Sequence, residues 1–142
     1  MADYVPSPTE WVREHVAKYE ATDGAEGYEL RGMACVIVTH TGSKTGAVRK
    51  SPLMRVQHGD RYVLVGSKGG APEDPLWVRN LRAHPDVTVR DRDRVFDVRA
   101  RFVTDPSERA EVWKSAVAAF PDYATYQTRT ERVIPLFVCE PR

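Results

Sequence analysis

The chain is poor in the features that mark membrane, secreted and metal-binding proteins. Its 142 residues hold no apolar run near the ~18–20 residues that cross a bilayer, so we expect no membrane span. The first residues carry neither a basic nor an apolar stretch, which argues against a secretory leader. Only two cysteines are present, Cys35 and Cys139, and the four histidines show no metal-ligand spacing. The sequence therefore predicts a cytoplasmic protein with buried, reduced thiols and no metal site.

Several catalytic and nucleotide-binding signatures are also missing. The run Gly42-Ser43-Lys44-Thr45 lacks the upstream glycine of a P-loop, since position 37 is Ile37. No G-x-G-x-x-G is present, so the Rossmann fingerprint is absent. No Ser-His-Asp set or pair of catalytic carboxylates is evident. The net charge of +1 gives no general attraction to nucleic acid, and we expect no nucleic-acid partner.

Two glycine-rich loops with cationic side chains stand out instead. The first follows Thr41, and the stretch 41–57 holds four cations and no acid. The second is Gly66-Ser67-Lys68-Gly69-Gly70-Ala71. Glycine lets backbone N–H groups approach an anion closely, and Lys or Arg neutralises its charge. Either loop alone is most often an ordinary hairpin turn, but together they predict a site for an anionic, phosphorylated ligand.

The order of expected elements favours an α+β fold with a mostly antiparallel sheet. Ser7-Pro8-Thr9-Glu10 has the pattern of a capping box and predicts an N-terminal helix over about 7–20. Apolar and alternating runs predict strands at 32–40, 48–57, 61–66, 87–90, 94–102 and 134–140. Further helices are expected after Asp74-Pro75 and at a second capping box, Asp105-Pro106-Ser107-Glu108. Hairpins dominate and no βαβ repeat occurs, so we expect one domain, 1–142, built as an antiparallel barrel.

Several short motifs follow one another in an informative order. They are Thr41-Gly42-Ser43-Lys44-Thr45-Gly46, Arg49-Lys50-Ser51-Pro52-Leu53, the loop 66–71, Pro75-Leu76-Trp77-Val78-Arg79-Asn80-Leu81, Tyr123-Ala124-Thr125-Tyr126-Gln127 and Arg132-Val133-Ile134-Pro135-Leu136. This order resembles the deazaflavin-dependent nitroreductase family of actinobacteria, over roughly residues 31–141. The resemblance implies a split β-barrel, with flanking helices, that uses reduced coenzyme F-420. Some family members are described as quinone reductases.

The resemblance also implies roles for individual residues. The positions that meet the phosphate and acidic tail of the cofactor are Lys44 and Arg49, in a loop with Ser43, Thr45 and Gly46. The loop that brings backbone N–H groups to the cofactor is matched by Ser67, Lys68, Gly69 and Gly70. The short helix that borders the binding groove is matched by Trp77 and Asn80. The tyrosines of the substrate pocket are matched by Tyr123 and Tyr126, and both, with Ser67, are candidate donors to a reacting oxygen.

The chain departs from the family pattern at three positions. Ser43 stands where an arginine often precedes the lysine, and Met54 stands where an aromatic residue sometimes follows Pro-Leu. Phe120 replaces a pocket tyrosine, which predicts a narrower range of nitro substrates. The expected reaction is hydride transfer from the reduced deazaflavin to a quinone, nitro or related electron-poor acceptor.

Other interpretations of the same residues stay open. A split-barrel oxidoreductase that uses flavin mononucleotide would also need cations for a phosphate, and a non-catalytic binding or storage module would bind coenzyme F-420 without turnover. Tyr123 and Tyr126, three residues apart, could simply pack in the core. A homodimer is an open expectation, because split barrels often pair by their sheets. The N-terminal helix carries charges beside apolar residues, which more often indicates a barrel-covering helix than contact with a membrane surface.

Overall fold

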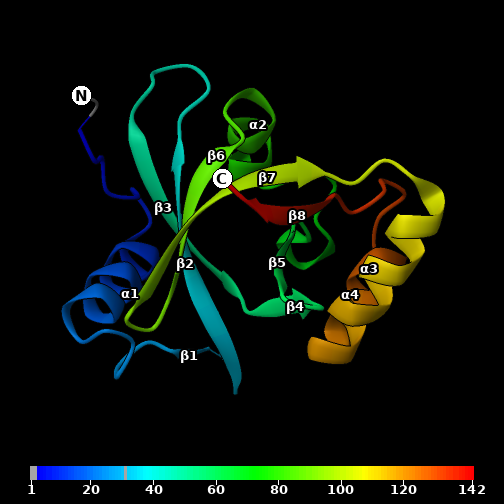
Figure 1. The fold of residues 1–142 in the computed structure, drawn as a ribbon, viewed down its shortest axis with the longest axis horizontal. Helices are drawn as coiled ribbons and strands as arrows, with labels where there is room; N and C mark the ends of the chain where they lie inside the picture. Colours follow the sequence, from blue (N-terminus) through cyan, green and yellow to red (C-terminus); the bar gives the residue numbers. More distant parts are fainter. Residues whose placement is uncertain (1–2, 31) are drawn as a thin grey trace.

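The computed structural model describes residues 3–30 and 32–142, and its centre is an eight-stranded sheet that curls into a half-barrel (Figure 1). The strands run in the order β1-β2-β6-β7-β8-β5-β4, and β3 pairs with β2. All these pairings are antiparallel. The bounds are β1 Glu29–Leu30, β2 Met33–Thr41, β3 Val48–Met54, β4 Val56–His58, β5 Arg61–Val65, β6 Asp86–Asp91, β7 Arg94–Phe102 and β8 Leu136–Pro141. The predicted antiparallel α+β split barrel is confirmed.

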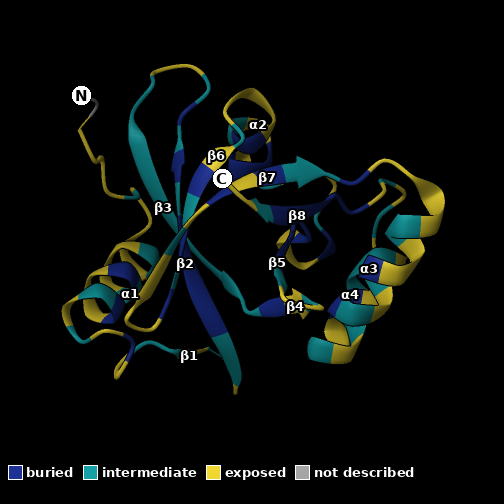
Figure 2. Ribbon diagram, viewed as in Figure 1, coloured by how far each residue is buried: buried dark blue, intermediate teal, exposed yellow. Residues whose placement is uncertain are grey.

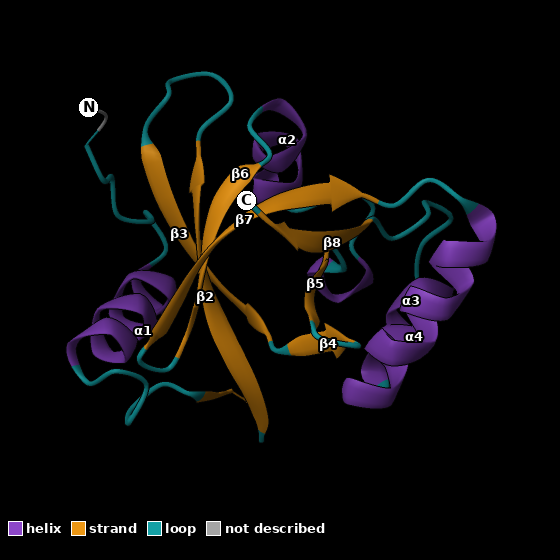
Figure 3. Ribbon diagram, in the orientation of Figure 1, coloured by secondary structure: helices purple, strands orange, loops and turns teal. Residues whose placement is uncertain are grey.

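In the part of the chain that the structure describes, four α-helices and one short 3-10 helix flank this sheet (Figure 3). Their bounds are α1 Glu10–Ala21, η1 Lys68–Gly70, α2 Leu76–Ala83, α3 Pro106–Ala119 and α4 Asp122–Thr128. Helix α1 packs beside β3, α2 packs against β2, and α3 packs against β4 (Figure 1). Within residues 3–30 and 32–142, no helix combines the length and the apolar character that crossing a bilayer requires.

Apolar side chains of the strands form much of the core. Figure 2 shows the buried segments along the strands in dark blue. A large cluster on one face includes Leu64, Val89 and Phe137, and a smaller cluster beneath α1 joins Tyr19 to Cys35 and other side chains of β2. Cys139 belongs to the large cluster, and both cysteines are free and buried. Burial disfavours the thiolate and raises the pKa of each cysteine to about 12. The prediction of two buried thiols is confirmed.

One of the two expected capping boxes is wrong. Helix α1 begins at Glu10 with Thr9 as its N-cap, and Thr9 makes no side-chain capping bond. The Ser7 hydroxyl instead accepts from the Thr9 N–H at 3.1 Å, a local turn that competes with the helix. The second box is correct at its N-cap, because the Asp105 carboxylate accepts from the Glu108 N–H at 2.8 Å.

The strand expected at 48–57 is two strands, with a break at Arg55. The Arg55 N–H bonds to the Ala34 carbonyl, and its guanidinium pairs with the buried Asp91 at 2.9 Å. This residue turns the chain from β3, which pairs with β2, to β4, which pairs with β5. The break therefore lets one segment contribute to both halves of the barrel. The two-residue strand β1 and the helical form of 122–128 were not predicted.

Candidate functional site

A cleft of about 560 Å³ lies between the barrel and the segments that cover it. Its apolar side is formed by β3, through Pro52, Leu53 and Met54, together with Val65 of β5. The lining also includes the aromatic residues Trp77, Phe120, Tyr123 and Tyr126, and the loop residues Ser67, Lys68 and Gly69. Pockets of this size and character suit small organic ligands. Six residues predicted for the site thus meet in one cavity, although they are spread over 60 positions.

The glycine loop of this cleft is a tight 3-10 turn. The Ser67 carbonyl accepts from the Gly70 N–H at 2.9 Å, and the Lys68 carbonyl accepts from the Ala71 N–H at 3.0 Å. Lys68, Gly69 and Gly70 all have positive φ, and for Lys68 this conformation is strained. A Cβ on Gly70 would lie 2.5 Å from the Tyr126 carbonyl oxygen, whereas a Cβ on Gly69 would meet nothing within 4 Å. Gly70 therefore brings the loop against α4, and Gly69 faces open space beside the cleft.

Arg132 stabilises this loop through hydrogen bonds to its carbonyls. Its guanidinium donates to the carbonyls of Ser67 at 2.7 Å, Ala71 at 2.9 Å and Gly66 at 3.1 Å. It also pairs with the Asp74 carboxylate at 2.7 Å, and its side chain is only 15% exposed. The planar fork of arginine can satisfy several acceptors at once, which lysine cannot. The sequence motif contained Arg132, but nothing in it indicated that its partners are carbonyls some 60 residues away.

The aromatic side of the cleft distinguishes the two tyrosines. Phe120 stacks edge-to-face on Tyr123, with ring centroids 5.0 Å apart, and on Tyr126, with centroids 6.0 Å apart. Tyr123 is 4% exposed and belongs to the core cluster of α3 and α4, and burial raises the pKa of its hydroxyl. Tyr126 is only partly buried against the same cluster. Tyr123 thus packs in the core as well as lining the cleft, and Tyr126 is the more accessible of the two.

The basic loop lies outside this cleft and contacts α2, which lines it. Lys44 and Thr45 are exposed at the turn between β2 and β3. Arg49 donates to the carbonyls of Val5 at 3.2 Å and Pro6 at 3.3 Å, so its guanidinium holds the N-terminal segment. Among the described residues that line the cleft, none comes from 43–49. The link is Asn80, whose side-chain oxygen accepts from the Ser43 N–H at 2.9 Å.

A second hollow of about 670 Å³ adjoins the cleft and shares Lys68 and Pro75 with it. Two arginines of α2, Arg79 and Arg82, complete a group of three cations around it. The neighbouring acids are Glu73 and Asp74, and Asp74 is already paired with Arg132. Arg79 and Arg82 are candidate anion-binding residues that the sequence motifs did not single out. Their spacing of three on a helix, which puts them on neighbouring turns, was the available signal.

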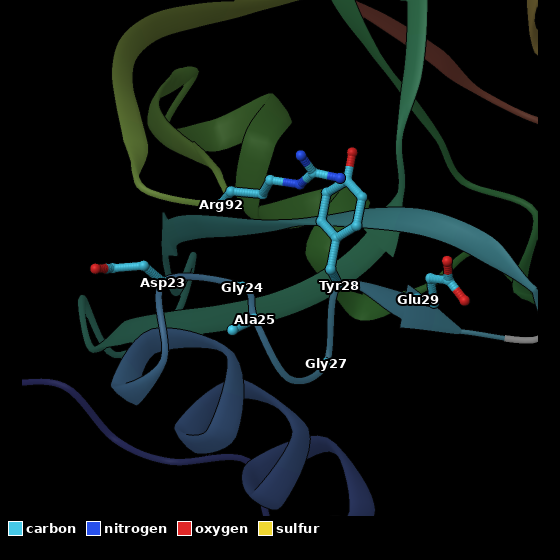
Figure 4. Close-up of a pocket in the computed structure, with 7 residues that line it drawn as sticks. All are labelled: Asp23, Gly24, Ala25, Gly27, Tyr28, Glu29 and Arg92. Carbon is cyan, nitrogen blue, oxygen red and sulfur yellow. The ribbon is translucent and has the colours of Figure 1, made fainter.

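A third hollow, of about 500 Å³, lies apart from these motifs (Figure 4). It is formed by the loop between α1 and β1 and by Arg92 at the β6–β7 turn. In Figure 4 the Arg92 guanidinium lies next to the Tyr28 ring, and its central carbon is 3.9 Å from the ring centroid. Gly24 also lines this hollow, and a Cβ added to it would lie 2.9 Å from the Arg92 Cα. These close contacts pack the loop against the turn and give the hollow a structural explanation.

Comparisons with known proteins give the chain a family. The model of a family described as F420H(2)-dependent quinone reductase matches residues 11–141. A protein of Mycobacterium tuberculosis with the same description is 37% identical over 131 residues, which cover 89% of this chain and 87% of that protein.

Two solved structures have similar folds. One, described as a domain-swapped dimer, is 45% identical with a TM-score of 0.73, and the match covers 94% of this chain and 100% of the other. A second, described as an F420-H2 dependent reductase, is 48% identical with a TM-score of 0.69 and covers 75% of this chain and 93% of the other. The family match spans most of the chain, and several of the motifs that suggested it, among them 66–71, 75–81 and 123–127, contribute residues to one cleft. The chain belongs to the family of quinone reductases that depend on reduced coenzyme F-420.

Proposed function

We propose that the protein, as one domain over 1–142, transfers a hydride from reduced coenzyme F-420 to a quinone. Membership of the quinone reductase family supports the cofactor and the reaction. The observation that carries the assignment to this site is that Ser67 and Trp77 line one cleft with Tyr126, which follows about 50 positions later. That cleft has an apolar side for a flat ring and hydroxyl groups for a reacting oxygen.

The residues present fit a planar deazaflavin with an anionic side chain. Leu53, Met54 and Trp77 offer apolar contacts to a tricyclic ring, and Ser67 offers a hydroxyl at the edge of the cleft. Lys68 lies where the cleft meets the cationic hollow of α2, so a ring in the cleft and an anion in the hollow could belong to one molecule. When bound, the reduced cofactor supplies the hydride.

The chain itself has to hold the acceptor, limit water and stabilise developing charge. A quinone oxygen gains negative charge as the hydride arrives, and a fixed hydrogen-bond donor lowers the energy of that transition state. We assign this donor to the Tyr126 hydroxyl, because Tyr126 lines the cleft and is more exposed than Tyr123. Ser67, which is 8% exposed, is the second candidate. Phe120 keeps the aromatic packing but offers no hydroxyl, which favours quinones over bulky nitro compounds.

The anionic part of the cofactor has two candidate sites. The first is the hollow of Lys68, Arg79 and Arg82, which adjoins the cleft. The second is the basic loop with Lys44, which reaches the same helix through Asn80. Lys44→Ala and Arg79→Ala should each weaken cofactor binding by about 1–3 kcal/mol if their side chains form charge-assisted bonds. The control is Lys114→Ala, which removes an exposed lysine of α3 that pairs with Glu111 at 3.5 Å.

Titration and turnover together test the proposed function. The purified protein is titrated with coenzyme F-420 and, in parallel, with flavin mononucleotide, with cofactor fluorescence as the readout. Oxidation of the reduced deazaflavin is then followed by absorbance with menadione as acceptor. We expect preferential binding of the deazaflavin and acceptor-dependent oxidation. Tight binding without oxidation by any quinone would make the protein a binding or storage module, and preference for flavin mononucleotide would refute the cofactor assignment.

We also propose that two copies of the chain associate in solution. The support is a relative, 45% identical to this chain, that is described as a domain-swapped dimer. Light scattering coupled to size exclusion would distinguish one chain from two. The cytoplasmic location expected from the sequence stays a prediction, and fractionation of cells that produce the protein would test it.

A further inference from the structure

A chain of hydrogen bonds joins the barrel to the basic loop. His40 of β2 contacts the Ser51 hydroxyl of β3 through Nε2 at 3.0 Å. Its other ring nitrogen, Nδ1, lies 3.2 Å from the Asn80 side-chain nitrogen on α2. Asn80 in turn accepts from the Ser43 N–H at 2.9 Å. His40 is 4% exposed, so this polar chain is buried at its centre.

The direction of every bond follows from one certain donor. A backbone N–H can only donate, so the Asn80 atom that faces Ser43 must be the amide oxygen. The Asn80 NH₂ group then faces His40 Nδ1, which must accept, and the ring proton must sit on Nε2 and point to Ser51. His40 is therefore neutral in this arrangement. Burial, and to a lesser degree the charge of Arg49, lower the pKa of His40 to about 4 and favour the same state.

We propose that His40 is a positioning residue for the cofactor's anionic part: its neutral ring holds the Asn80 amide in the orientation that fixes Ser43 and the basic loop 43–46 against α2. The cofactor part of this proposal rests on the proposed function. Helix α2 also carries Trp77 of the cleft, one turn before Asn80. The same short helix thus connects the apolar cleft with the loop that carries Lys44.

The loop's own hydrogen bonds do not replace this attachment. Gly42 donates to the Ala47 carbonyl at 2.8 Å, and Gly46 donates to the Gly42 carbonyl at 2.9 Å. These bonds close the turn on itself at the end of the β2–β3 ladder, and the Asn80–Ser43 bond joins it to α2. Without an acceptor at Nδ1, the Asn80 NH₂ group loses its partner on β2, and only the bond from the Ser43 N–H still holds the amide in its present orientation. Turning it over would put NH₂ opposite the Ser43 N–H, two donors facing each other, and release the loop.

Two substitutions of His40 separate positioning from packing. Gln can accept from Asn80 with its amide oxygen and donate to Ser51 with its NH₂ group, so His40→Gln retains the chain of bonds. Leu fills a similar volume without either group, so His40→Leu breaks it. Asn80→Ala removes the link at a partly buried position and serves as a second test if His40→Leu folds poorly.

The first readout is amide hydrogen exchange at Ser43, which needs no cofactor. We expect exchange at least about 10-fold faster in His40→Leu and Asn80→Ala, which corresponds to a loss of about 1.4 kcal/mol in the free energy of local opening. Exchange in His40→Gln should stay near wild type. The second readout is the dissociation constant for coenzyme F-420, expected to rise about 5- to 10-fold in the two disrupted variants. In His40→Leu, turnover at saturating cofactor should stay within about 2-fold, because His40 does not line the cleft.

A double-mutant cycle tests the link to Lys44. Lys44→Ala should weaken binding less in the His40→Leu background than in the wild type, because the lysine is no longer held in place. Unchanged Ser43 exchange in the disrupted variants would overturn the positioning role. Additive effects of the two substitutions, or failure of His40→Gln to restore binding, would overturn the connection to the cofactor. If the wild type did not bind deazaflavin at all, the cofactor role would be refuted. Ser43 exchange would still test whether His40 keeps the Asn80–Ser43 bond in place.

Discussion

Gly70 lies against α4 whereas the neighbouring Gly69 faces open space, so alanine substitutions at the two positions can be compared directly. Any L-residue at a φ of 81° is strained by about 1–2 kcal/mol, and Gly70→Ala would also push a methyl group to 2.5 Å from the Tyr126 carbonyl oxygen. Overpacking against backbone costs about 1–3 kcal/mol more, since a carbonyl cannot rotate away as a side chain can. Gly69→Ala meets the same kind of strain at a φ of 62° but has open space around its methyl group. We expect Gly70→Ala to be less stable than Gly69→Ala by about 2 kcal/mol.

Thermal and urea unfolding of the two variants measure this difference. In a chain of this length, about 2 kcal/mol corresponds to roughly 6 °C in Tm. Gly70→Ala should also weaken the deazaflavin complex, because relief of the clash displaces α4 and with it Tyr126. Equal stability of the two variants would refute the proposed close contact between Gly70 and the Tyr126 carbonyl.

Three further predictions concern the cleft and its supports. Tyr126→Phe should lower kcat/KM for menadione about 10-fold or more with little change in cofactor affinity, whereas Tyr123→Phe should mainly change stability; the reverse pattern would reassign the donor. The pKa of His40 is lowered from 6.5 in the unfolded chain to about 4 in the fold. The free energy of unfolding should therefore fall by up to about 3 kcal/mol as the pH drops from 6.5 to 4. His40→Gln should flatten this pH dependence in urea titrations. Arg132→Lys should destabilise the fold by about 2–4 kcal/mol, because one ammonium cannot serve three carbonyls and a carboxylate; a loss below 0.5 kcal/mol in urea unfolding would contradict the clamp.

The barrel was predictable because its signals are local. Alternation along 94–102 and the turn at His58-Gly59-Asp60 each specify one hairpin within a few residues, and Asp105 caps α3 through a bond three positions away. The start of α1 was not predictable from the same kind of pattern. There a Ser-Pro-Thr-Glu run offers two competing local bonds, and the Ser7 hydroxyl makes the non-helical one. The break at Arg55 depends on Asp91, 36 positions later, and no local pattern encodes it.

The residues of the candidate site were likewise only partly predictable from local motifs. Ser67, Trp77 and Tyr126 could be selected from the sequence through the family motifs, and all three line the cleft. The cavity itself, and the accessibility that separates Tyr126 from Tyr123, depend on how α3 packs against β4 and β5 and how α4 packs against η1 and α3. Arg49 was predicted to meet an anion, but its guanidinium donates to the N-terminal segment, a contact with carbonyls that no side-chain motif reveals. Its role in cofactor binding stays a prediction.

The two thiols described in the core are natural reporters of unfolding. Cys35 lies under α1 and Cys139 lies in the large cluster of the barrel, and both are at most 2% exposed. With the pKa of each raised to about 12, neither reacts with an alkylating agent until its surroundings open. Pulsed labelling followed by peptide mass spectrometry would therefore time two events separately: the lifting of α1 from β2 and the opening of the barrel. The wild-type chain already carries one probe for each, so no label need be engineered into it.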